Sequence, residues 1–422
     1  MAKNTPYFID KAQEYPGRKN LEQTIDAGIL IVGAGMTGIS TAYALSTKID
    51  PACITVVDSG RVGFSTTGRS AGLLVDSVEE DYSDTSPEEY NQIRRGIKGI
   101  VDAVETENLS CALTRMPSLY LASDLKEQVS TVKREFEARK EAGFEVELLS
   151  PEQLQEQYAI TAYGAMVNRE GFCLNPVAFC QTMAEILEKR GVRIYEQAKI
   201  IGLDEKRKSA LTLWGNINYQ KLVLTNSSPS LENNMLTGRA LLLSTVAAVT
   251  EPLSPEQYHQ TFKNGEHMGW DAPEVDYMYF RPVGENRLLI GGSDRLTSLR
   301  SARNNPSIPT GKDAQNVRKL FEKTFPHLCK VPFSHVWSGI IPASIDSIPF
   351  AGEYKPDHYV GLYSPGLPNA FNCGRILAQF ISGETPETRL LDEDRKIPFA
   401  NRIRTLTKYE PFTTMANNFY FS

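Results

Sequence analysis

The clearest pattern of apolar positions lies in GILIVGAGMTGISTAYALSTKIDPACITVVD, over residues 28–58. It begins with an apolar run of strand length, continues with apolar positions at helical spacing, and ends on a second short apolar run. The pattern predicts a strand, a helix and a second strand in immediate succession.

Three glycines stand where the first predicted strand passes into the helix: Gly33, Gly35 and Gly38. At this spacing the first glycine permits a tight turn, the second lets the backbone approach a pyrophosphate, and the third lets the helix pack closely on the strand. Asp58, which ends the second strand, is placed to accept hydrogen bonds from ribose hydroxyls. Glycines cluster in many turns, so the alternative is a purely structural turn. The surrounding strand, helix and acid favour dinucleotide binding.

A loop rich in glycine and hydroxyl side chains follows directly, SGRVGFSTTGRSAGLL at residues 59–74. A nicotinamide-binding domain would more often begin another helix at this point. The loop offers a row of backbone N–H groups, together with Thr66, Thr67 and Ser70, to an extended anionic ligand. The alternative is an ordinary surface loop.

A second periodicity appears in DYMYFRPVGENRLLIGG, which predicts two strands joined by a hairpin turn at GEN. Alternation along the first strand places Tyr277, Tyr279 and Arg281 on one face and Met278 and Phe280 on the other. By itself the pattern indicates a half-buried sheet whose hydroxyls and guanidinium are satisfied by their neighbours. Contact of Tyr277 or Tyr279 with a substrate is the alternative, and it is implied by the family resemblance described below.

Two polar stretches interrupt these patterns. VKREFEARKEAGF, at residues 132–144, predicts a helix whose charged side chains face solvent. EEDYSDTSPEEY, at residues 79–90, is acidic and rich in turn formers, which marks a crossing between two parts of the fold.

Composition narrows the class of protein. The chain has 422 residues, enough for two or three domains, and its 41% hydrophobic and 23% charged residues exclude a disordered or fibrous protein. A net charge of −6 gives no indication of nucleic-acid binding. The start of the chain lacks the pattern of a secretory signal, and no apolar run approaches the length of a membrane span. We therefore expect a cytoplasmic protein without a membrane span.

The cysteines and histidines give no sign of a metal site. The six cysteines lie far apart without a CxxC pair, so we expect buried thiols in a reducing compartment. The five histidines show no ligand spacing and are expected to be packed or surface residues.

The fingerprint, the acid and the loop together resemble the D-amino-acid oxidase superfamily of FAD-dependent enzymes, which includes glycine oxidase, sarcosine oxidase and bacterial amine dehydrogenases. In that family the acid is followed by a G-x-x-S-G-R-N-x-G-like stretch under the flavin, and GFSTTGRSAG at residues 63–72 is similar to it. Segments at 171–203, 247–253 and 364–384 are similar to later parts of the family in the same order. The resemblance covers almost the whole chain and implies FAD, held non-covalently, as cofactor.

The resemblance also implies the fold. It is α/β, with a Rossmann-like FAD-binding domain of the glutathione-reductase type interleaved with an antiparallel-sheet substrate domain. The FAD-binding domain is predicted at 25–80, 155–230 and 333–390, the substrate-binding domain at 81–154 and 231–332, and a C-terminal extension at 391–422.

Motif and resemblance together predict the site residues. The candidate catalytic residues are Tyr277, Tyr279, Arg281 and Ile341. The candidate FAD-binding residues are Gly33, Ala34, Gly35, Met36, Thr37, Gly38, Asp58, Ser59, Thr66, Thr67, Gly68, Arg69, Ser70, Ala71, Gly72, Ile200, Gly339, Gly366, Leu367, Pro368 and Asn369.

One position departs from the family in an informative way. WSGIIPASIDSIP, at residues 337–349, is similar to the family pattern W-x-G-x-R-P-x-T-x-D-x-x-P, with Ile341 in place of the arginine that pairs with the substrate carboxylate. A carboxylate buried against isoleucine without a partner would cost several kcal/mol, on the order of 2 to 7 for an unpaired polar group alone. Either the substrate presents an apolar or uncharged group to Ile341, or another cation such as Arg281 receives the acid.

Three other family residues are missing. The lysine that activates oxygen in sarcosine oxidases would fall near Leu289, and the residues that link flavin covalently would fall near Gly339 and Arg69. The glycines of the last flavin loop are reduced to Gly366. Rapid reaction with oxygen therefore does not follow from the resemblance, and oxygen or another electron acceptor remains open.

The implied reaction is oxidation of the carbon–nitrogen bond of a small-molecule amine by hydride transfer to flavin, followed by hydrolysis of the imine. A flavin hydroxylase would carry a later Gly-Asp motif and a disulfide reductase a CxxxxC, and neither is present. The remaining alternative is a flavoprotein with reduced or lost turnover that serves as a binding partner or sensor.

Overall fold

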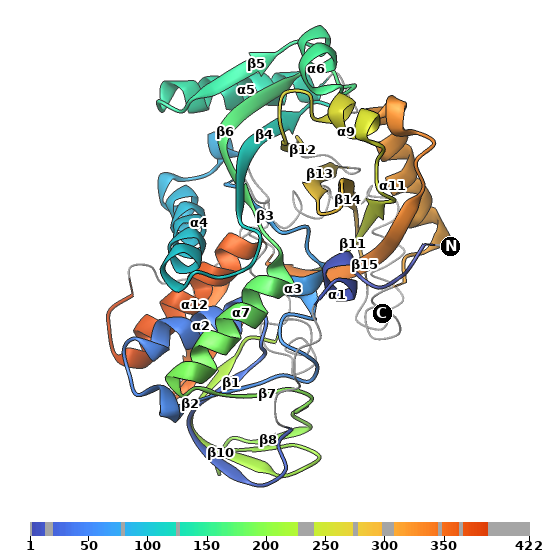
Figure 1. Cartoon of the computed structure of the whole chain (residues 1–422). Coiled ribbons are helices and arrows are strands. Elements are labelled where there is room, and N and C mark those ends of the chain that lie inside the picture. Colours follow the sequence, from blue (N-terminus) through green and yellow to red (C-terminus); the bar gives the residue numbers. More distant parts are fainter. Residues whose placement is uncertain are drawn as a thin grey trace, which may run out of the picture.

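The computed structural model describes residues 2–12, 20–76, 81–123, 127–226, 240–272, 277–297, 308–344, 348–362 and 366–386. The predicted C-terminal extension at 391–422 and Asp346 lie outside these residues. Within them the chain forms two large sheets, which lie at opposite ends of the view in Figure 1.

The first sheet has the order β16-β17-β10-β1-β2-β7, with β8 and β9 appended to β10. The five strands from β17 to β7 pair in parallel, while β16, β9 and β8 pair antiparallel. Their bounds are β1 (Ile25–Val32), β2 (Ile54–Val57), β7 (Arg193–Tyr195), β8 (Gly202–Asp204), β9 (Ser209–Leu211), β10 (Asn216–Leu224), β16 (Phe350–Lys355) and β17 (His358–Leu362).

Helices cover the parallel strands on the face shown uppermost in Figure 1. Their apolar side chains form the largest core cluster together with those of β1, β2 and β7. The helices are α2 (Met36–Ser46), α4 (Pro87–Glu107), α7 (Pro176–Arg190) and α12 (Leu367–Ser382). Close packing of α12 on α2 requires Gly374, since a Cβ there would lie 2.0 Å from Ser40 Oγ.

The second sheet has the order β15-β11-β14-β13-β12-β4-β6-β3, with β5 beside β6. It is antiparallel except for the β12–β4 pair. Its strands are β3 (Leu73–Leu74), β4 (Thr114–Leu121), β5 (Val146–Leu149), β6 (Ala165–Cys173), β11 (Ala240–Thr250), β12 (Met268–Asp271), β13 (Met278–Val283), β14 (Arg287–Leu296) and β15 (Phe333–Ser344).

One face of the second sheet packs on Phe321 and Phe325 at the end of α11, together with Leu154 of α6. The short helices α1 and α3 lie between the two sheets (Figure 1). The remaining helical elements are α1 (Tyr7–Asp10), α3 (Thr66–Arg69), α5 (Gln128–Glu141), α6 (Pro151–Tyr158), α9 (Pro255–Thr261), α11 (Gly311–Thr324) and the 3-10 turns η1 (Pro51–Cys53), η2 (Tyr82–Asp84) and η3 (Pro326–Leu328).

The predicted α/β class with a parallel and an antiparallel sheet is confirmed. The predicted domain boundaries stay a prediction, but the sheets depart from them at three places. Three strands that fall in predicted FAD-binding segments pair in the second sheet: β3, β6 and β15. Long apolar strands of the two sheets have similar sequence patterns. The pattern of a strand therefore does not show which sheet it joins, since that depends on its tertiary partners.

Two further expectations need correction. Cys53 and Cys329 are exposed, and only the other four cysteines are buried. In α5, Glu135 and Arg139 are each 1% exposed, although the charged sequence predicted a solvated helix. Of the helices that the structure describes, none combines the length and apolar character needed to cross a membrane.

Candidate active site

The glycine turn between β1 and α2 has the predicted geometry. Gly33 has φ +112°, which strongly favours glycine, and a Cβ on Gly38 would lie 1.8 Å from the carbonyl oxygen of Gly33. Gly35 is the N-cap residue of α2, and as a glycine it supplies no side-chain cap to this helix end. The Met36 N–H donates to Thr67 Oγ1 at 3.0 Å. A helix end of this kind, with a hydroxyl beside it, suits a phosphate-bearing ligand.

Asp58 lies directly beside this turn at the end of β2. Its carboxylate accepts hydrogen bonds from the N–H of Ala34 at 2.7 Å and of Gly60 at 2.8 Å. Burial raises the pKa of Asp58, and the two N–H groups oppose that shift. The carboxylate is therefore held in place at the carboxyl edge of the parallel strands, where nucleotides bind in this type of sheet.

The loop at residues 63–72 joins the two sheets. It contains α3, whose Gly68 is packed so closely that a Cβ would lie 2.4 Å from the carbonyl oxygen of Gly63. Arg69 Nη1 donates to the carbonyl of Ser338 at 3.1 Å, and Trp337 Nε1 donates to the carbonyl of Arg69 at 3.0 Å. The loop is thus fixed against the segment of β15 that resembles the family pattern.

Alternation on β13 is as predicted. Met278 and Phe280 are fully buried in the cluster that packs on α11. Tyr279 belongs instead to the cluster that contains Ala71 and Trp337, on the side of the 63–72 loop. Strand register extends this face, because Tyr279 pairs with Gly291, Gly291 with Ala247, and Ala247 with Trp337.

Tyr279 lies flat over the glycine of the neighbouring strand. A Cβ on Gly291 would lie 2.3 Å from the Tyr279 hydroxyl, so no larger residue fits at that position. Burial raises the pKa of Tyr279, and Asp294 adds to the shift. The hydroxyl therefore keeps its proton at neutral pH. The ring of Tyr277 lies 6.0 Å from that of Tyr279.

Arg281 is 4% exposed, and the described residues give it no carboxylate partner. Nη1 donates to the carbonyl of Gly72 over a long 3.5 Å, and Nε has no hydrogen-bond partner. The guanidinium carbon lies 5.1 Å from the ring centre of Phe8. Burial lowers the pKa of Arg281, and the Cys173 thiol opposes that shift weakly. Burial also raises the pKa of Cys173, so the thiol carries no countercharge.

Ile341 follows Trp337 and Gly339 at two-residue spacing on β15, so all three share one face of the strand. It packs with Leu243 and Leu296 in a small apolar cluster. The position of the family arginine is therefore apolar in its surroundings as well as in its residue type.

The other predicted residues are more scattered. Ile200 is half-buried against the cluster on the outer side of the first sheet. Gly366, with φ +77°, is the N-cap residue of α12, and Leu367, Pro368 and Asn369 in its first turn are buried. Their contact with a cofactor stays a prediction.

Sequence patterns did not indicate the N-terminal residues of this site. Tyr7 and Phe8 are buried in the same cluster as Tyr279 and Trp337, and Ile9 lies against Gly68 of α3. No local pattern predicts this, since the segment is short and its contacts are distant in the chain.

The chain matches the family model described as FAD dependent oxidoreductase (DAO) over residues 28–380. It is 25% identical to the gamma-glutamylputrescine oxidoreductase of Escherichia coli over 433 residues, covering 98% of this chain and 96% of that protein. It is also 25% identical to a probable oxidoreductase OrdL of Haemophilus influenzae, covering 93% of this chain and 91% of that protein.

Solved structures agree in fold. The glycine oxidase of Geobacillus kaustophilus superposes with a TM-score of 0.74 at 17% identity, covering 88% of this chain and 100% of the other. The match of the family model over most of the chain confirms the resemblance, with FAD as the cofactor of the family. The chain belongs to the DAO family of FAD-dependent oxidoreductases.

Proposed function

We propose that this protein oxidises the carbon–nitrogen bond of an amine or amino-acid-like small molecule, and that any acid group of the substrate is received by Arg281. One observation carries the proposal: the family's anchor position is apolar at Ile341, while a buried guanidinium without a carboxylate partner among the described residues lies on β13, three strands away in the same sheet. The E. coli relative, named for gamma-glutamylputrescine, supports an amine as the substrate class.

The residues around the first turn fit FAD. The pyrophosphate would lie at the N-terminus of α2, beside Thr67. Asp58 would accept hydrogen bonds from the ribose hydroxyls of the adenosine. The 63–72 loop and β15 would enclose the flavin ring. The chemistry that FAD supplies when bound is acceptance of a hydride from the carbon next to nitrogen.

The protein's own part is binding and desolvation. Hydride loss requires the neutral amine, because the nitrogen lone pair assists it, and an apolar wall lowers the pKa of an amine by disfavouring its charged form. Ile341 with Leu243 and Leu296 provides such a wall. Tyr279, whose pKa is raised by burial, can donate a hydrogen bond but does not serve as a base at neutral pH.

The experiment is anaerobic mixing of the FAD-loaded protein with matched amines, followed by bleaching of the flavin absorbance. The pairs are propylamine with γ-aminobutyrate and ethylamine with β-alanine, which differ by one carboxylate, together with glycine and sarcosine. We expect amines to reduce the flavin, and the carboxylate of each pair to raise kcat/KM by about 10- to 100-fold. Glycine and sarcosine are expected to react no faster than the uncharged amines.

Arg281→Met should abolish the preference within each pair while the uncharged amines react as before. Arg190→Met is the control, because Arg190 is paired with Glu107 at 2.7 Å on helices that cover the first sheet, away from Arg281. Flavin that no amine reduces would contradict amine oxidation and favour a binding or sensing flavoprotein. Fast reduction by glycine would contradict the role given to Ile341 and Arg281.

A further inference from the structure

Phe8 supports one face of the Arg281 guanidinium. The ring centre is 5.1 Å from the guanidinium carbon, and Phe8 itself is 4% exposed. An arginine stacked on an aromatic ring is attracted to it and loses rotational freedom, while its N–H groups stay free at the edge of the plane. For Arg281 those edge groups are poorly used: among the described residues Nε has no hydrogen-bond partner, Nη1 makes a long contact to the Gly72 carbonyl, and the remaining polar neighbour is the uncharged Cys173 thiol.

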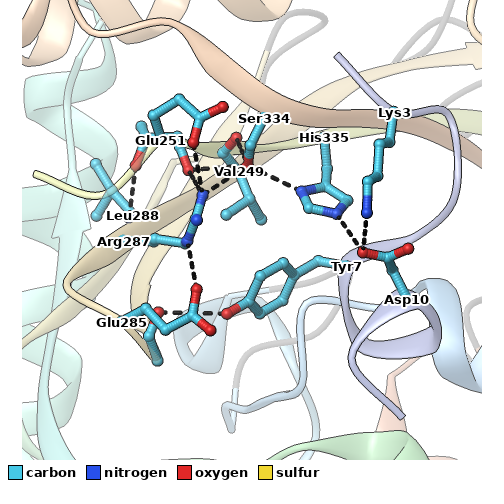
Figure 2. A network of polar contacts seen from close by, with 12 residues as sticks. Lys3, Tyr7, Asp10, Val249, Glu251, Glu285, Arg287, Leu288, Ser334 and His335 are labelled. Atoms are coloured by element: carbon cyan, nitrogen blue, oxygen red, sulfur yellow. Dashed lines mark hydrogen bonds and ion pairs between the residues drawn. The ribbon is translucent and has the colours of Figure 1, made fainter.

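The segment that carries Phe8 is held by the network in Figure 2, with one set of contacts to β15 and another to the hairpin turn after β13. In the first set, the Lys3 N–H donates to the Ser334 carbonyl and the Val336 N–H donates to the Lys3 carbonyl, both at 2.8 Å. Asp10 then receives Lys3 Nζ at 2.7 Å and lies 3.1 Å from His335 Nε2.

In the second set, residues of the same segment contact the turn that follows β13. The Tyr7 hydroxyl donates to the Gly284 carbonyl at 3.3 Å, and Lys11 pairs with Glu285 at 2.7 Å. Glu285 in turn lies 3.1 Å from Arg287 Nε, and Arg287 Nη1 donates to Ser334 Oγ at 3.0 Å. Phe8 is therefore fixed relative to both β15 and the hairpin that carries Arg281.

We infer that Phe8 is a positioning residue, which holds the Arg281 guanidinium ready for a carboxylate or similar anion of the substrate, and that residues 2–12 form a wall of this site. The inference rests on the proposed function for the identity of the ligand. It adds a specificity element from a segment outside the match to the family model, which begins at residue 28.

The test measures anion binding without turnover. Acetate, with acetamide as its uncharged counterpart, is titrated into the FAD-loaded protein and followed by the change in the flavin spectrum. Phe8→Leu keeps an apolar side chain but removes the ring, and Phe8→Tyr restores a ring. We expect Phe8→Leu to raise the Kd for acetate by about 2- to 10-fold, the cost of immobilising one freed side chain, with Phe8→Tyr close to the parent.

The matched control is Phe136→Leu, which removes an aromatic ring from beside Lys140 on α5. It should leave the acetate Kd unchanged. FAD retention and Tm are recorded for every variant, so that a general loosening is recognised by its effect on acetamide and FAD as well.

Equal weakening of acetate in Phe8→Leu and Phe8→Tyr, or none in either, would overturn the positioning role. Unchanged acetate affinity in Arg281→Met with a changed flavin spectrum would show that Arg281 serves the flavin instead, and would also overturn it. Acetate binding that depends on Phe8 in a protein that oxidises no amine would leave this inference standing and remove the proposed function alone.

Discussion

Two arginines in this molecule carry a buried positive charge, and the residues around them treat that charge in opposite ways. Arg139 is 1% exposed and Arg281 is 4% exposed, and each guanidinium lies against aromatic rings. Arg139 binds Asp76 at 3.0 Å and Glu135 at 2.6 Å, whereas Arg281 has no carboxylate partner among the described residues.

The two pKa shifts follow from this difference. Burial alone would lower the pKa of Arg139, but Asp76 and Glu135 raise it above its ordinary value. Burial lowers the pKa of Arg281, and the opposing effects of Cys173, Tyr7 and Glu266 are too weak to reverse that shift. A buried cation that pairs with carboxylates has a structural role. A buried cation without such a partner costs stability, which favours a functional role such as ligand binding.

The largest effect is expected from Arg139→Met. It leaves Asp76 and Glu135 buried without a cation, and breaking a buried pair in this way costs about 3 to 5 kcal/mol of unfolding free energy. Urea unfolding measures the loss. Arg134→Met on the same helix is the control, because Arg134 is half exposed and its pair with Asp84 is worth at most about 1 kcal/mol. Equal losses in the two variants would contradict the structural role of Arg139.

The same substitution at Arg281 should have the opposite outcome for stability. Arg281→Met replaces an unpaired buried cation by an apolar side chain, so the unfolding free energy is expected to stay within about 1 kcal/mol of the parent or to rise. Urea unfolding of the FAD-free protein measures it, so that ligand linkage does not enter. A loss as large as that of Arg139→Met would make Arg281 a structural residue and end the contrast.

The contrast also shows what sequence can and cannot reveal. The turn at Gly33, Gly35 and Gly38 and the alternation on β13 were predictable, because each depends on neighbours within a few residues. The burial of Arg139 was not, because Glu135 is its partner within the helix but Asp76 and the ring of Tyr82 in the η2 turn come from outside it. The sequence pattern of a charged helix face is the same whether its charged side chains face solvent or pair with carboxylates from distant parts of the chain.

The residues of the site also divide into those that local sequence patterns indicate and those that they do not. The family motifs located the 63–72 loop and the departure at Ile341, since both are written in contiguous residues. Phe8 and Arg281 are in contact but lie far apart in the sequence, so no local pattern indicates the contact. The pairing of β3, β6 and β15 in the second sheet also leaves no local trace, because the tertiary fold decides which strands are neighbours.

A third buried charge beside the Arg139 cluster allows a pH test. Asp81 is 4% exposed and accepts a hydrogen bond from Tyr120, and burial raises its pKa from 3.8 to about 6. The raised pKa means that the folded protein favours protonated Asp81, so this contribution to stability is present below about pH 4 and is lost as the pH rises through about 6.

Asp81→Asn should therefore gain about 2 to 3 kcal/mol relative to the parent between about pH 4 and about pH 7.5. Urea unfolding at both pH values gives the difference. Asp84→Asn in the same turn is the control, since its side chain is 32% exposed. A relative stability of Asp81→Asn that does not change with pH would show that Arg134 neutralises Asp81 as fully as Asp76 neutralises Arg139.

The smallest effect is expected from Tyr7→Phe, which separates the ring packing of the N-terminal helix from its hydrogen bond. The ring lies 5.5 Å from Phe8 and 5.3 Å from His335, and both contacts survive the change. Only the hydrogen bond to Gly284 is lost, and that residue is exposed enough for water to replace the hydroxyl. The unfolding free energy should fall by about 0.5 to 1 kcal/mol, with the acetate Kd unchanged. If Tyr7→Phe weakened acetate as much as Phe8→Leu, the hydroxyl and the hairpin turn, and not the ring of Phe8, would be what holds Arg281 ready.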